Sequence, residues 1–507
     1  MMKPVYLILL GALFAPATLA AETKLPTFSG YDASDSISPN QNGANPIDLN
    51  LPDLGDVSAT VLTPSDERRI ADQIMRDVYS SDDVVSDVEI NDYVQSLGYR
   101  LASSGPDKQQ PFNFFVVQDN TINAFALPGG VVGVHTGLII ASSNESELAS
   151  VLGHEIGHVV QHHMARMLAQ QKQDSIINLA ALAFGLLAAV GNPQLGNGAL
   201  TAASAGAVQS QLNYTRAHEQ EADRVGLQIL DSAGFDVRAM PAFFETLQRG
   251  TRFVEGTAPS FLRTHPLTSE RIADVRGRVE QMPYRQVKDS PEFQYIRAKL
   301  LSTLGSPTQA AAVFQGNLDE KKYTNEAAQH YGLAEALLRK NDLDGASKQL
   351  QWLRANAPRH PMFESLAAHI AVARNNPAEA AKIYAAGLAM FPGHRALIYG
   401  YAEHFLASNQ PDKVLQLVAD KQSLYPDDPY LYELKSRAYT MQGKNLLRHQ
   451  AQGEAYYRRY DIPKAVDQME LATKAGDGDF YQQSIVEARF KELKRLAAEP
   501  KKDSIFN

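Results

Sequence analysis

The segment HEIGH at residues 154–158 holds the residue types of a zinc site that cleaves peptide bonds. Side chains four residues apart on a helix point the same way, so His154 and His158 could bind one metal ion together. A catalytic zinc ion takes three protein ligands and keeps a fourth position for water. Glu155 lies beside the first ligand, where its carboxylate could take a proton from that water and pass it to the leaving amine. The spacing therefore predicts a zinc peptidase whose third ligand lies elsewhere in the chain.

A glutamate in the segment 213–230 is the candidate for that third ligand. A longer zinc-protease motif would place a histidine six residues after His158, but Met164 stands there. The apolar residues of 213–230 form one helical face, and Glu219 falls about 50° from its centre, whereas Glu221 lies about 110° away. Because a glutamate aimed at a core is costly unless it is paired or metal-bound, we expect Glu219 to face the metal. The alternative is a capping or salt-bridged carboxylate.

Three further residues near these ligands could support the site. Asp223 lies one turn after Glu219 and could hydrogen-bond a ligand histidine, which would fix the tautomer of that histidine. His162 and His163 continue the histidine stripe. A metal ion held by His154 and His158 would be too far from His162, so we interpret both as residues of the surface or of the layer behind the ligands.

Strand-like and helical patterns must position these residues. The stretches FNFFVVQDN at 112–120 and GGVVGVHTGLII at 129–140 are β-branched and aromatic, which is typical of strands. Asn144 and Glu147 have the spacing of a capping box, which marks the start of the helix that carries His154. The run at 176–190 is almost wholly apolar and is as long as a buried helix, although a mobile apolar lid near the site is the alternative.

The composition and the first residues bound the class of protein. The chain has 507 residues, 44% of them hydrophobic and 21% charged, which allows more than one globular domain. The net charge of -9 argues against nucleic acid as a partner. Residues 1–21 read as a secretory signal peptide, and 22–63 as a flexible segment rich in Ser, Asn, Asp, Pro and Gly. No cysteine is present, so no disulfide can form.

The second half of the chain repeats with a period of 34 residues. The matching positions are three prolines, three asparagines and two sets of alanines: Pro358, Pro392 and Pro426; Asn341, Asn375 and Asn409; Ala334, Ala368 and Ala402; Ala346 and Ala380. Thirty-four residues is the tetratricopeptide period, in which each repeat is a pair of antiparallel helices. A single repeat cannot bury its own apolar face, so we expect a stacked array over 292–490 that binds protein or peptide, with a passive spacer as the alternative.

The pair HEIGH and EQEAD (219–223) resembles the metallopeptidase family of the CAAX prenyl endopeptidases and their soluble bacterial relatives. In that family the third zinc ligand is the glutamate four residues before the aspartate, which maps onto Glu219. The stretch 123–139 is similar to the family's substrate-facing edge strand. With the signal peptide and the repeats, nearly the whole chain resembles a periplasmic branch of this family. That resemblance implies a protease with a chaperone role toward outer-membrane proteins and their assembly machinery.

The resemblance also gives a role to the stretch FLRTHPLTSERIADV at 261–275. A histidine in such a Thr-His-Pro stretch can close the open zinc position and hold the enzyme off, which maps onto His265. A neutral imidazole is a good zinc ligand, and a fourth protein ligand would displace the catalytic water. The alternative is a residue at a helix start with no metal contact. Arg271, one turn further on, could pair with a carboxylate or a reaction oxyanion.

Together these patterns predict a multidomain protein, with a mostly helical α+β zincin-type metallopeptidase at 64–285 followed by an all-α tetratricopeptide array. We expect one zinc ion held by His154, His158 and Glu219, with His265 as a regulatory fourth ligand, and Glu155 and Asp223 in catalysis. The exported protein would have no membrane-spanning segment, and it would present peptide substrates to an edge strand near 129–134. The rivals are a binding protein with a structural zinc ion and a scaffold without metal.

Overall fold

The computed structural model describes residues 62–170, 216–252 and 260–498, all of which belong to one compact unit at 55–507. The signal peptide at 1–21, most of the segment 22–63 and the apolar run at 176–190 lie outside these described residues. Within the described ranges, no helix combines the length and the apolarity that crossing a membrane would require.

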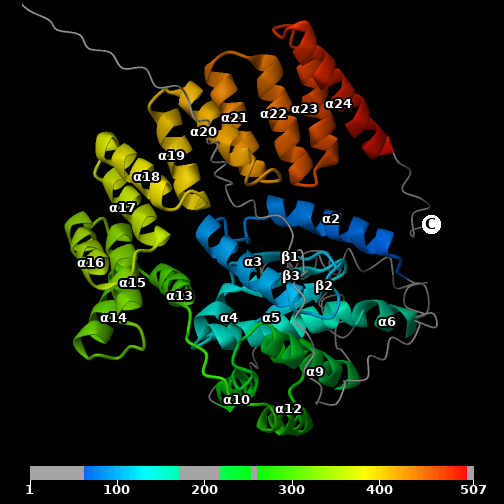
Figure 1. Ribbon diagram of the computed structural model, residues 1–507, viewed down its shortest axis with the longest axis vertical. Helices are drawn as coiled ribbons and strands as arrows, with labels where there is room; N and C mark the ends of the chain where they lie inside the picture. The colour runs from blue at the N-terminus through cyan, green and yellow to red at the C-terminus, as the bar shows by residue number, and fades with distance from the viewer. Residues whose placement is uncertain (1–61, 171–215, 253–259, 499–507) are drawn as a thin grey trace, which may run out of the picture. The chain divides into compact units, whose positions relative to one another are not determined.

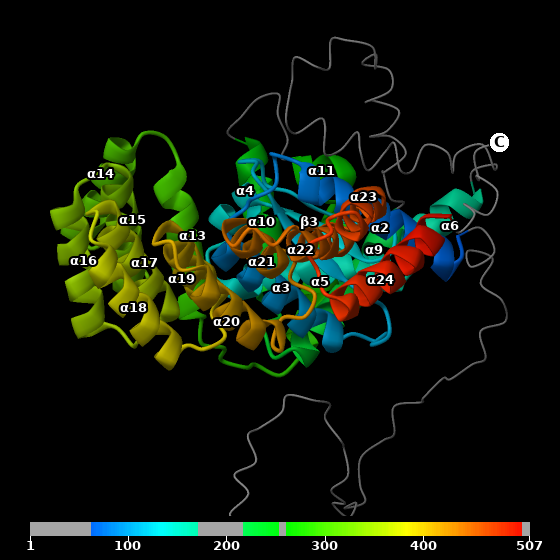
Figure 2. The same ribbon diagram turned by 90° about the horizontal axis from the view of Figure 1, so that it is seen from above.

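A three-stranded sheet lies at the centre of the protease part (Figures 1 and 2). Its strands are β1 (Asn113–Val117), β2 (Ala124–Leu127) and β3 (Val131–His135). The spatial order is β1-β3-β2, with β3 parallel to β1 and antiparallel to β2. The prediction of an edge strand near 129–134 was therefore wrong, because β3 has a partner on both sides and the edge strands are β1 and β2. Strands β2 and β3 are both fully buried, so apolar patterning alone did not separate them.

The tight turn between β2 and β3 explains two glycines of the sequence. Gly129 and Gly130 have φ angles of 74° and 78°, a left-handed backbone that glycine adopts without steric strain. A Cβ atom at Gly130 would also lie 2.0 Å from the carbonyl oxygen of Pro111. Only glycine at both positions lets β2 return directly alongside β3, which brings the edge strand over the zinc-motif helix.

That helix, α5 (Glu145–Val160), packs closely against α9 (Arg216–Ser232). The Asn144 side chain caps α5 by accepting a hydrogen bond from the Glu147 amide at 3.0 Å. Gly226 allows the close approach, since a Cβ atom there would lie 2.9 Å from the His154 backbone nitrogen. A Cβ atom at Gly157 would lie 2.9 Å from the carbonyl oxygen of Ala222. The contact sets the start of α9 opposite the histidines of α5.

Other helices surround the sheet and this helix pair. They are α2 (Pro64–Ser80), α3 (Val88–Ser103), α4 (Thr136–Ala141), α6 (His163–Gln170), α10 (Ala239–Arg252), α11 (Ser260–Thr264) and α12 (Ser269–Gln281). His265 directly follows α11, and Arg271 lies in the first turn of α12, which Thr268 caps. The protease part is thus mostly helical with a small sheet, as the sequence predicted.

The rest of the described chain is a succession of antiparallel helices in chain order, green to red in Figure 1. They are α13 (Pro291–Thr303), α14 (Pro307–Asp319), α15 (Glu326–Arg339), α16 (Leu343–Asn356), α17 (Pro361–Ala373), α18 (Pro377–Met390), α19 (Arg395–Ala407), α20 (Pro411–Gln422), α21 (Pro429–Met441), α22 (Asn445–Arg458), α23 (Ile462–Thr473) and α24 (Phe480–Ala498).

The repeated asparagines end the first helix of each pair. Asn341, Asn375 and Asn409 have φ angles of 63°, 54° and 54°, the left-handed conformation that closes a helix C-terminus. Gly443, one further period along the chain, has a φ angle of 70° and takes the same place. Asparagine and glycine recur because they are the residues that tolerate this conformation best.

The repeated prolines and alanines also occupy equivalent places. Pro358, Pro392 and Pro426 each stand three residues before the start of the next helix, at Pro361, Arg395 and Pro429. The alanines are fully buried where helices cross: Ala334, Ala346, Ala368, Ala380 and Ala402. Small side chains there allow the helices of one pair to approach closely. The prediction of stacked helix pairs is confirmed.

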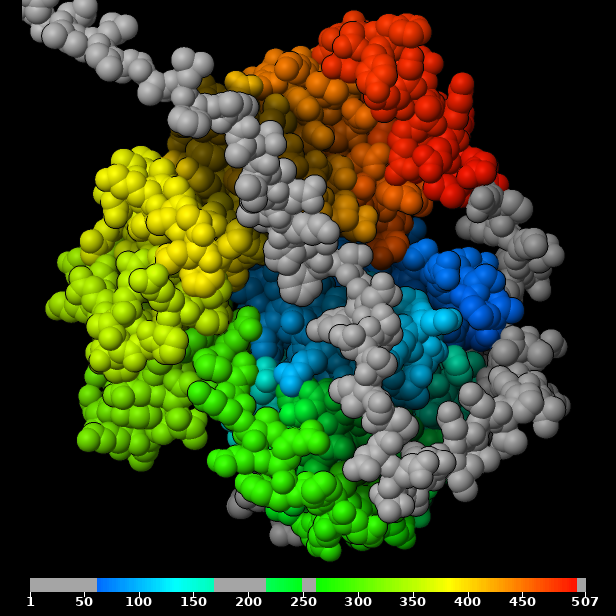
Figure 3. All heavy atoms as spheres, in the orientation of Figure 1, coloured from blue at the N-terminus to red at the C-terminus, as the bar shows by residue number. Residues whose placement is uncertain are grey.

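The array contacts the protease part through a buried carboxylate. Glu89 on α3 is 4% exposed and accepts a hydrogen bond from Lys299 Nζ on α13 at 2.6 Å. His394 Nε2 lies 2.9 Å from the same carboxylate, and the Ser365 hydroxyl on α17 also donates to it. Tyr460 stacks on Tyr79 of α2 with 6.4 Å between ring centroids. Figure 3 shows blue atoms of the protease part next to orange atoms of the array.

Candidate metal centre

Four buried residues offer ligand atoms that all lie within 4.8 Å of one another: His154, His158, Glu219 and His265. Nε2 of His154 lies 3.0 Å from Nε2 of His158 and 3.5 Å from Oε2 of Glu219. Nε2 of His158 lies 3.4 Å from Oε1 of Glu219. Nδ1 of His265 lies 3.0 Å from Oε1 of Glu219 and 3.4 Å from Nε2 of His154. Two helices and the residue after a third thus converge on one point.

These separations fit a metal ion bound by four protein ligands. Ligand atoms around a tetrahedral zinc ion, with bonds of ~2.0–2.1 Å, lie about 3.3 Å apart. The five distances between 3.0 and 3.5 Å bracket that value. Imidazole nitrogens and a carboxylate oxygen are also donors that zinc accepts. His265 therefore offers a ligand atom in the same cluster as the other three residues.

Glu155 lies beside this cluster but contributes none of its ligand atoms. Its side chain is fully buried, and neither carboxylate oxygen accepts a well-formed hydrogen bond from the described residues. His265 Nε2 lies 3.5 Å from Oε1, and the Ala126 backbone on β2 is close to the carboxylate. Burial raises the pKa of the Glu155 carboxyl. A buried carboxylate with unused acceptor capacity next to a metal site is suited to take a proton from water.

Asp223 and Arg271 lie behind His154. Oδ1 of Asp223 is 2.9 Å from Nδ1 of His154, so the carboxylate holds the nitrogen that faces away from the cluster. Arg271 donates to both oxygens of Asp223 at 2.7 Å, and its Nη1 is 2.6 Å from Oε2 of Glu219. The sequence suggested either a carboxylate or a reaction oxyanion as the partner of Arg271. In the structure Arg271 pairs with two carboxylates, those of Asp223 and Glu219.

The charges of these groups shift their pKa values strongly. Burial opposes the charge on Glu219, but His265, His154 and His158 lower its pKa well below the usual range. Burial also disfavours a charged His154, yet Asp223 and Glu219 outweigh it and raise the pKa of His154 to about 9. A bound metal ion must displace that proton. Burial lowers the pKa of His158 to about 3, which leaves its imidazole neutral and ready to bind metal.

The net charge of the site also favours a cation. Glu155, Glu219 and Asp223 are three carboxylates, and they face the Arg271 guanidinium and, in the metal-free site, a protonated His154, which leaves one negative charge when all are ionised. The three carboxylates and Arg271 are at most 1% exposed. Buried charges are expensive unless they are paired, so a divalent cation in place of the His154 proton would complete the balance.

Comparison with known proteins decides the family. The model of Peptidase family M48 matches residues 89–279, and a tetratricopeptide repeat model matches 371–438. The beta-barrel assembly-enhancing protease of Escherichia coli (strain K12) is 32% identical over 449 residues, 88% of this chain and 91% of that protein. This chain belongs to the beta-barrel assembly-enhancing proteases of family M48. The M48 relative of that name in Yersinia pestis is 30% identical over 88% of this chain and 92% of its own length.

A third M48 relative is more similar over a shorter stretch. The putative beta-barrel assembly-enhancing protease of Vibrio cholerae is 39% identical over 312 residues. That match spans 61% of this chain and 64% of the Vibrio protein. Family membership makes this chain an M48 metallopeptidase with a helical repeat region, and its metal site is the cluster on α5, α9 and the residue after α11.

The sequence reading of this M48 peptidase missed the connection between two polar residues. Glu221 leans outward as expected, with its side chain 38% exposed, but its carboxylate lies 3.1 Å from Nε2 of His163. His163 is fully buried, and its Nδ1 lies 2.8 Å from Nδ1 of His158. Its only sequence signal was its place beside His162, where the histidine stripe continues.

Proposed function

We propose that this M48 peptidase is a periplasmic zinc endopeptidase with chaperone-like activity. It acts on unfolded or partly assembled outer-membrane β-barrel proteins, alongside the machinery that assembles them. Relatives named beta-barrel assembly-enhancing proteases support the client class. The observation that carries the enzyme assignment is the buried, hydrogen-bond-poor Glu155 beside a four-ligand cluster.

The donor set supports zinc as the metal, held by His154, His158 and Glu219. Neutral imidazoles and a carboxylate in tetrahedral spacing suit this ion. When bound, zinc would polarise the substrate carbonyl and lower the pKa of water. Glu155 would take a proton at its carboxylate and return it to the leaving amine. Asp223, held by Arg271, would keep the His154 tautomer fixed.

The edge strand β2 is the proposed place of the substrate backbone. Within the described residues β2 pairs in the sheet only with β3, so the backbone groups of its outer edge lie outside the ladder and could pair with an added strand. Ala126 on this strand is close to the Glu155 carboxylate, which would set a peptide bond next to the proton acceptor. Pairing through the backbone needs few side-chain contacts, which suits unfolded clients.

His265 supports a resting state in which the fourth position is closed. Its Nδ1 lies within the ligand cluster, 3.0 Å from Glu219, and a fourth protein ligand would exclude the catalytic water. Substrate would have to displace the segment after α11 before cleavage. Such restraint suits a protease whose repeats also hold clients that are to be assembled.

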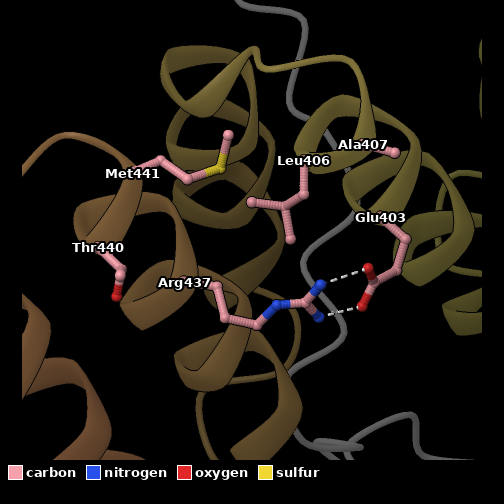
Figure 4. A pocket seen from close by; sticks show the side chains of 6 residues that line it. All are labelled: Glu403, Leu406, Ala407, Arg437, Thr440 and Met441. Carbon is pink, nitrogen blue, oxygen red and sulfur yellow. Dashed lines mark hydrogen bonds and ion pairs between the residues drawn. The ribbon is translucent and has the colours of Figure 1, made fainter.

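The array is proposed to hold those clients. Figure 4 shows a hollow between α19 and α21, with the Arg437 and Glu403 side chains paired across it. Its volume is about 330 Å³, and it is lined by Glu403, Leu406, Ala407, Arg437, Thr440 and Met441. Apolar side chains beside a charged pair could bind an extended peptide through both kinds of contact. The proposed division of the chain is a signal peptide at 1–21, a flexible segment at 22–63, the metallopeptidase at 64–285 and the repeat array at 292–490.

The test is Glu155→Gln in the full-length protein. The amide cannot accept a proton, so cleavage of an unfolded substrate should fall by about 10²–10⁴-fold while zinc content is kept. Glu280→Gln, on the exposed face of α12, is the matched control and should leave cleavage unchanged. Cleavage by Glu155→Gln at the wild-type rate would refute the proton-transfer role.

His265→Ala separates the switch from the rival readings. If His265 closes the site at rest, the variant should bind zinc and cleave substrate faster than the wild type. A structural metal ion would instead give a protein that is inactive both with and without the substitution. A scaffold without metal would show no zinc in the purified wild type and no stability change on adding it.

A further inference from the structure

A hydrogen-bonded chain runs away from the metal site behind His158. Nδ1 of His158 lies 2.8 Å from Nδ1 of His163. Nε2 of His163 lies 3.1 Å from Oε2 of Glu221, which also accepts a hydrogen bond from Arg166 Nη1 at 3.0 Å. The chain therefore leads from a ligand histidine through a second imidazole to a carboxylate at the surface.

The order of donors and acceptors in this chain follows from the carboxylate. An ionised Glu221 can only accept, so the proton between it and His163 must sit on Nε2 of His163. A neutral His163 then has its lone pair on Nδ1, where it accepts the Nδ1 proton of His158. This leaves the lone pair of His158 on Nε2, the atom that lies among the metal ligands.

A break between two helices brings the second imidazole into place. On a continuous helix a residue five positions after His158 would point about 140° away from it. The chain instead turns at His162, whose φ angle is 50°, and α6 begins at His163. The ring of His163 is fully buried and stacks on His218 of α9, with 4.5 Å between centroids. The orientation of His163 is thus fixed from two sides.

We propose that His163 is a positioning residue that, with Glu221, fixes the tautomer and ring orientation of His158 for metal binding. The inference rests on the proposed zinc site. His154 has the equivalent support from Asp223 directly, at 2.9 Å. The two ligand histidines of α5 are therefore held by carboxylates on opposite sides of α9, one directly and one through an imidazole. Removing such a partner typically weakens metal affinity 10–100-fold.

A pair of variants at one position separates hydrogen bonding from packing. Leucine and asparagine have similar sizes, but the Oδ1 atom of asparagine can accept the Nδ1 proton of His158. In the full-length protein, His163→Leu should bind zinc 10–100-fold more weakly, measured by competition with a chromophoric chelator. His163→Asn should stay within about threefold of the wild type. His162→Asn is the control and should change nothing, since asparagine tolerates a positive φ angle.

Cobalt substitution gives a readout that a merely structural role would not move. Cobalt(II) in the site reports ligand geometry through its visible absorption, so His163→Leu should alter the spectrum and His163→Asn should keep it. If His163→Leu does not fold, Glu221→Ala takes its place, because that side chain is 38% exposed, and it should weaken zinc binding several-fold.

The outcomes distinguish this inference from the function on which it rests. Wild-type zinc affinity and an unchanged cobalt spectrum in both His163→Leu and Glu221→Ala would overturn the positioning role alone. A wild-type protein that binds neither zinc nor cobalt would overturn the proposed function instead. Weaker binding in His163→Leu together with His163→Asn, without spectral change, would point to packing and also overturn the inference.

Discussion

Two buried carboxylate clusters of the molecule have opposite surroundings. At the junction with the array, both oxygens of Glu89 have hydrogen-bond partners. Lys299 donates to Oε2, and Ser365 and His394 lie at Oε1. In the metal centre, Glu155 is equally buried, yet no well-formed hydrogen bond from the described residues reaches it. The junction balances its charge within the protein, whereas the site keeps an excess of negative charge.

The difference shows that a buried glutamate can serve either to hold the fold together or to take part in chemistry. A carboxylate whose acceptor capacity is filled fixes the position of its neighbours and has little left for a ligand. A buried carboxylate that accepts no hydrogen bonds can still bind a metal ion or take up a proton. Its burial without partners lowers the stability of the metal-free fold. Both glutamates are at most 4% exposed, so burial alone does not tell them apart.

Metal removal should give the largest difference between the two clusters. If zinc balances the site, chelation should lower the free energy of unfolding by about 4 kcal/mol when the free metal concentration had been 1,000 times the dissociation constant. Urea unfolding of loaded and chelated protein measures this. Superimposable curves would mean that the site does not need a cation, and the comparison would lose its basis.

Removing the charge at the junction should have the next largest effect. Glu89→Gln removes one of the two carboxylates that pair with Lys299, the other being Asp87, and should lower the free energy of unfolding by about 2 kcal/mol. The loss should be the same in loaded and chelated protein, because the junction binds no metal. Glu320→Gln is the control, since that side chain is 59% exposed. A loss that depended on metal would show the clusters to be coupled.

The pH dependence of stability should reveal the junction. Burial opposes ionisation of Glu89, but Lys299 and His394 outweigh it and hold its pKa well below the unfolded value of 4.5. A carboxyl with a lowered pKa stabilises the fold above the unfolded value, and this stability is lost as the pH falls. Between pH 5 and about 3, the gap in unfolding free energy between wild type and Glu89→Gln should therefore shrink.

Two other groups near Glu89 are present in both proteins, although the charge of Glu89 itself acts to raise the pKa of His360. Asp87 pairs with Lys299 at 2.6 Å, and burial lowers the pKa of His360 to about 4. His360 resists protonation in the fold, so it reduces stability of both proteins as the pH falls below 6.5. A gap that widened on acidification would contradict the assignment of Glu89 as an ionised residue.

The smallest expected effect lies in the array, away from both clusters. Asn375 ends α17 with a φ angle of 54°, so Asn375→Ala should lower the free energy of unfolding by about 1 kcal/mol. Asn375→Gly should be neutral, because Gly443 holds the equivalent place in a later repeat. Thermal unfolding of the two variants tests this, and equal stability would mean that the left-handed turn is not under strain.

Local patterns predicted most of the fold and the centre of the site. His154 and His158 share a helix, and Glu219 followed from the apolar face of α9, so their convergence needed only helical geometry. The 34-residue period predicted the array because each repeat copies the same helix ends. These features depend on neighbours in the sequence.

Features that depend on distant neighbours were not predictable in the same way. Glu89 read as an ordinary helix residue, because its partners on α13, α17 and before α19 come from far along the chain. The place of His163 depends on a left-handed turn at His162, a non-glycine residue that gives no such signal. The order of β2 and β3 depends on pairing, which two fully buried strands do not reveal.

The junction at Glu89 also limits how the repeat array can change its length. One carboxylate on α3 receives donors from α13, from α17 and from the residue before α19. Inserting or deleting a repeat between α13 and α19 would carry His394 away by a whole helix pair and leave Glu89 without one of its partners. The number of helices in that stretch is therefore constrained by the partners of a single side chain. A change of repeat number between α19 and Tyr460 would break the stacking of Tyr460 on Tyr79, so gain or loss of a repeat disturbs these contacts least after Tyr460, towards the end of the chain.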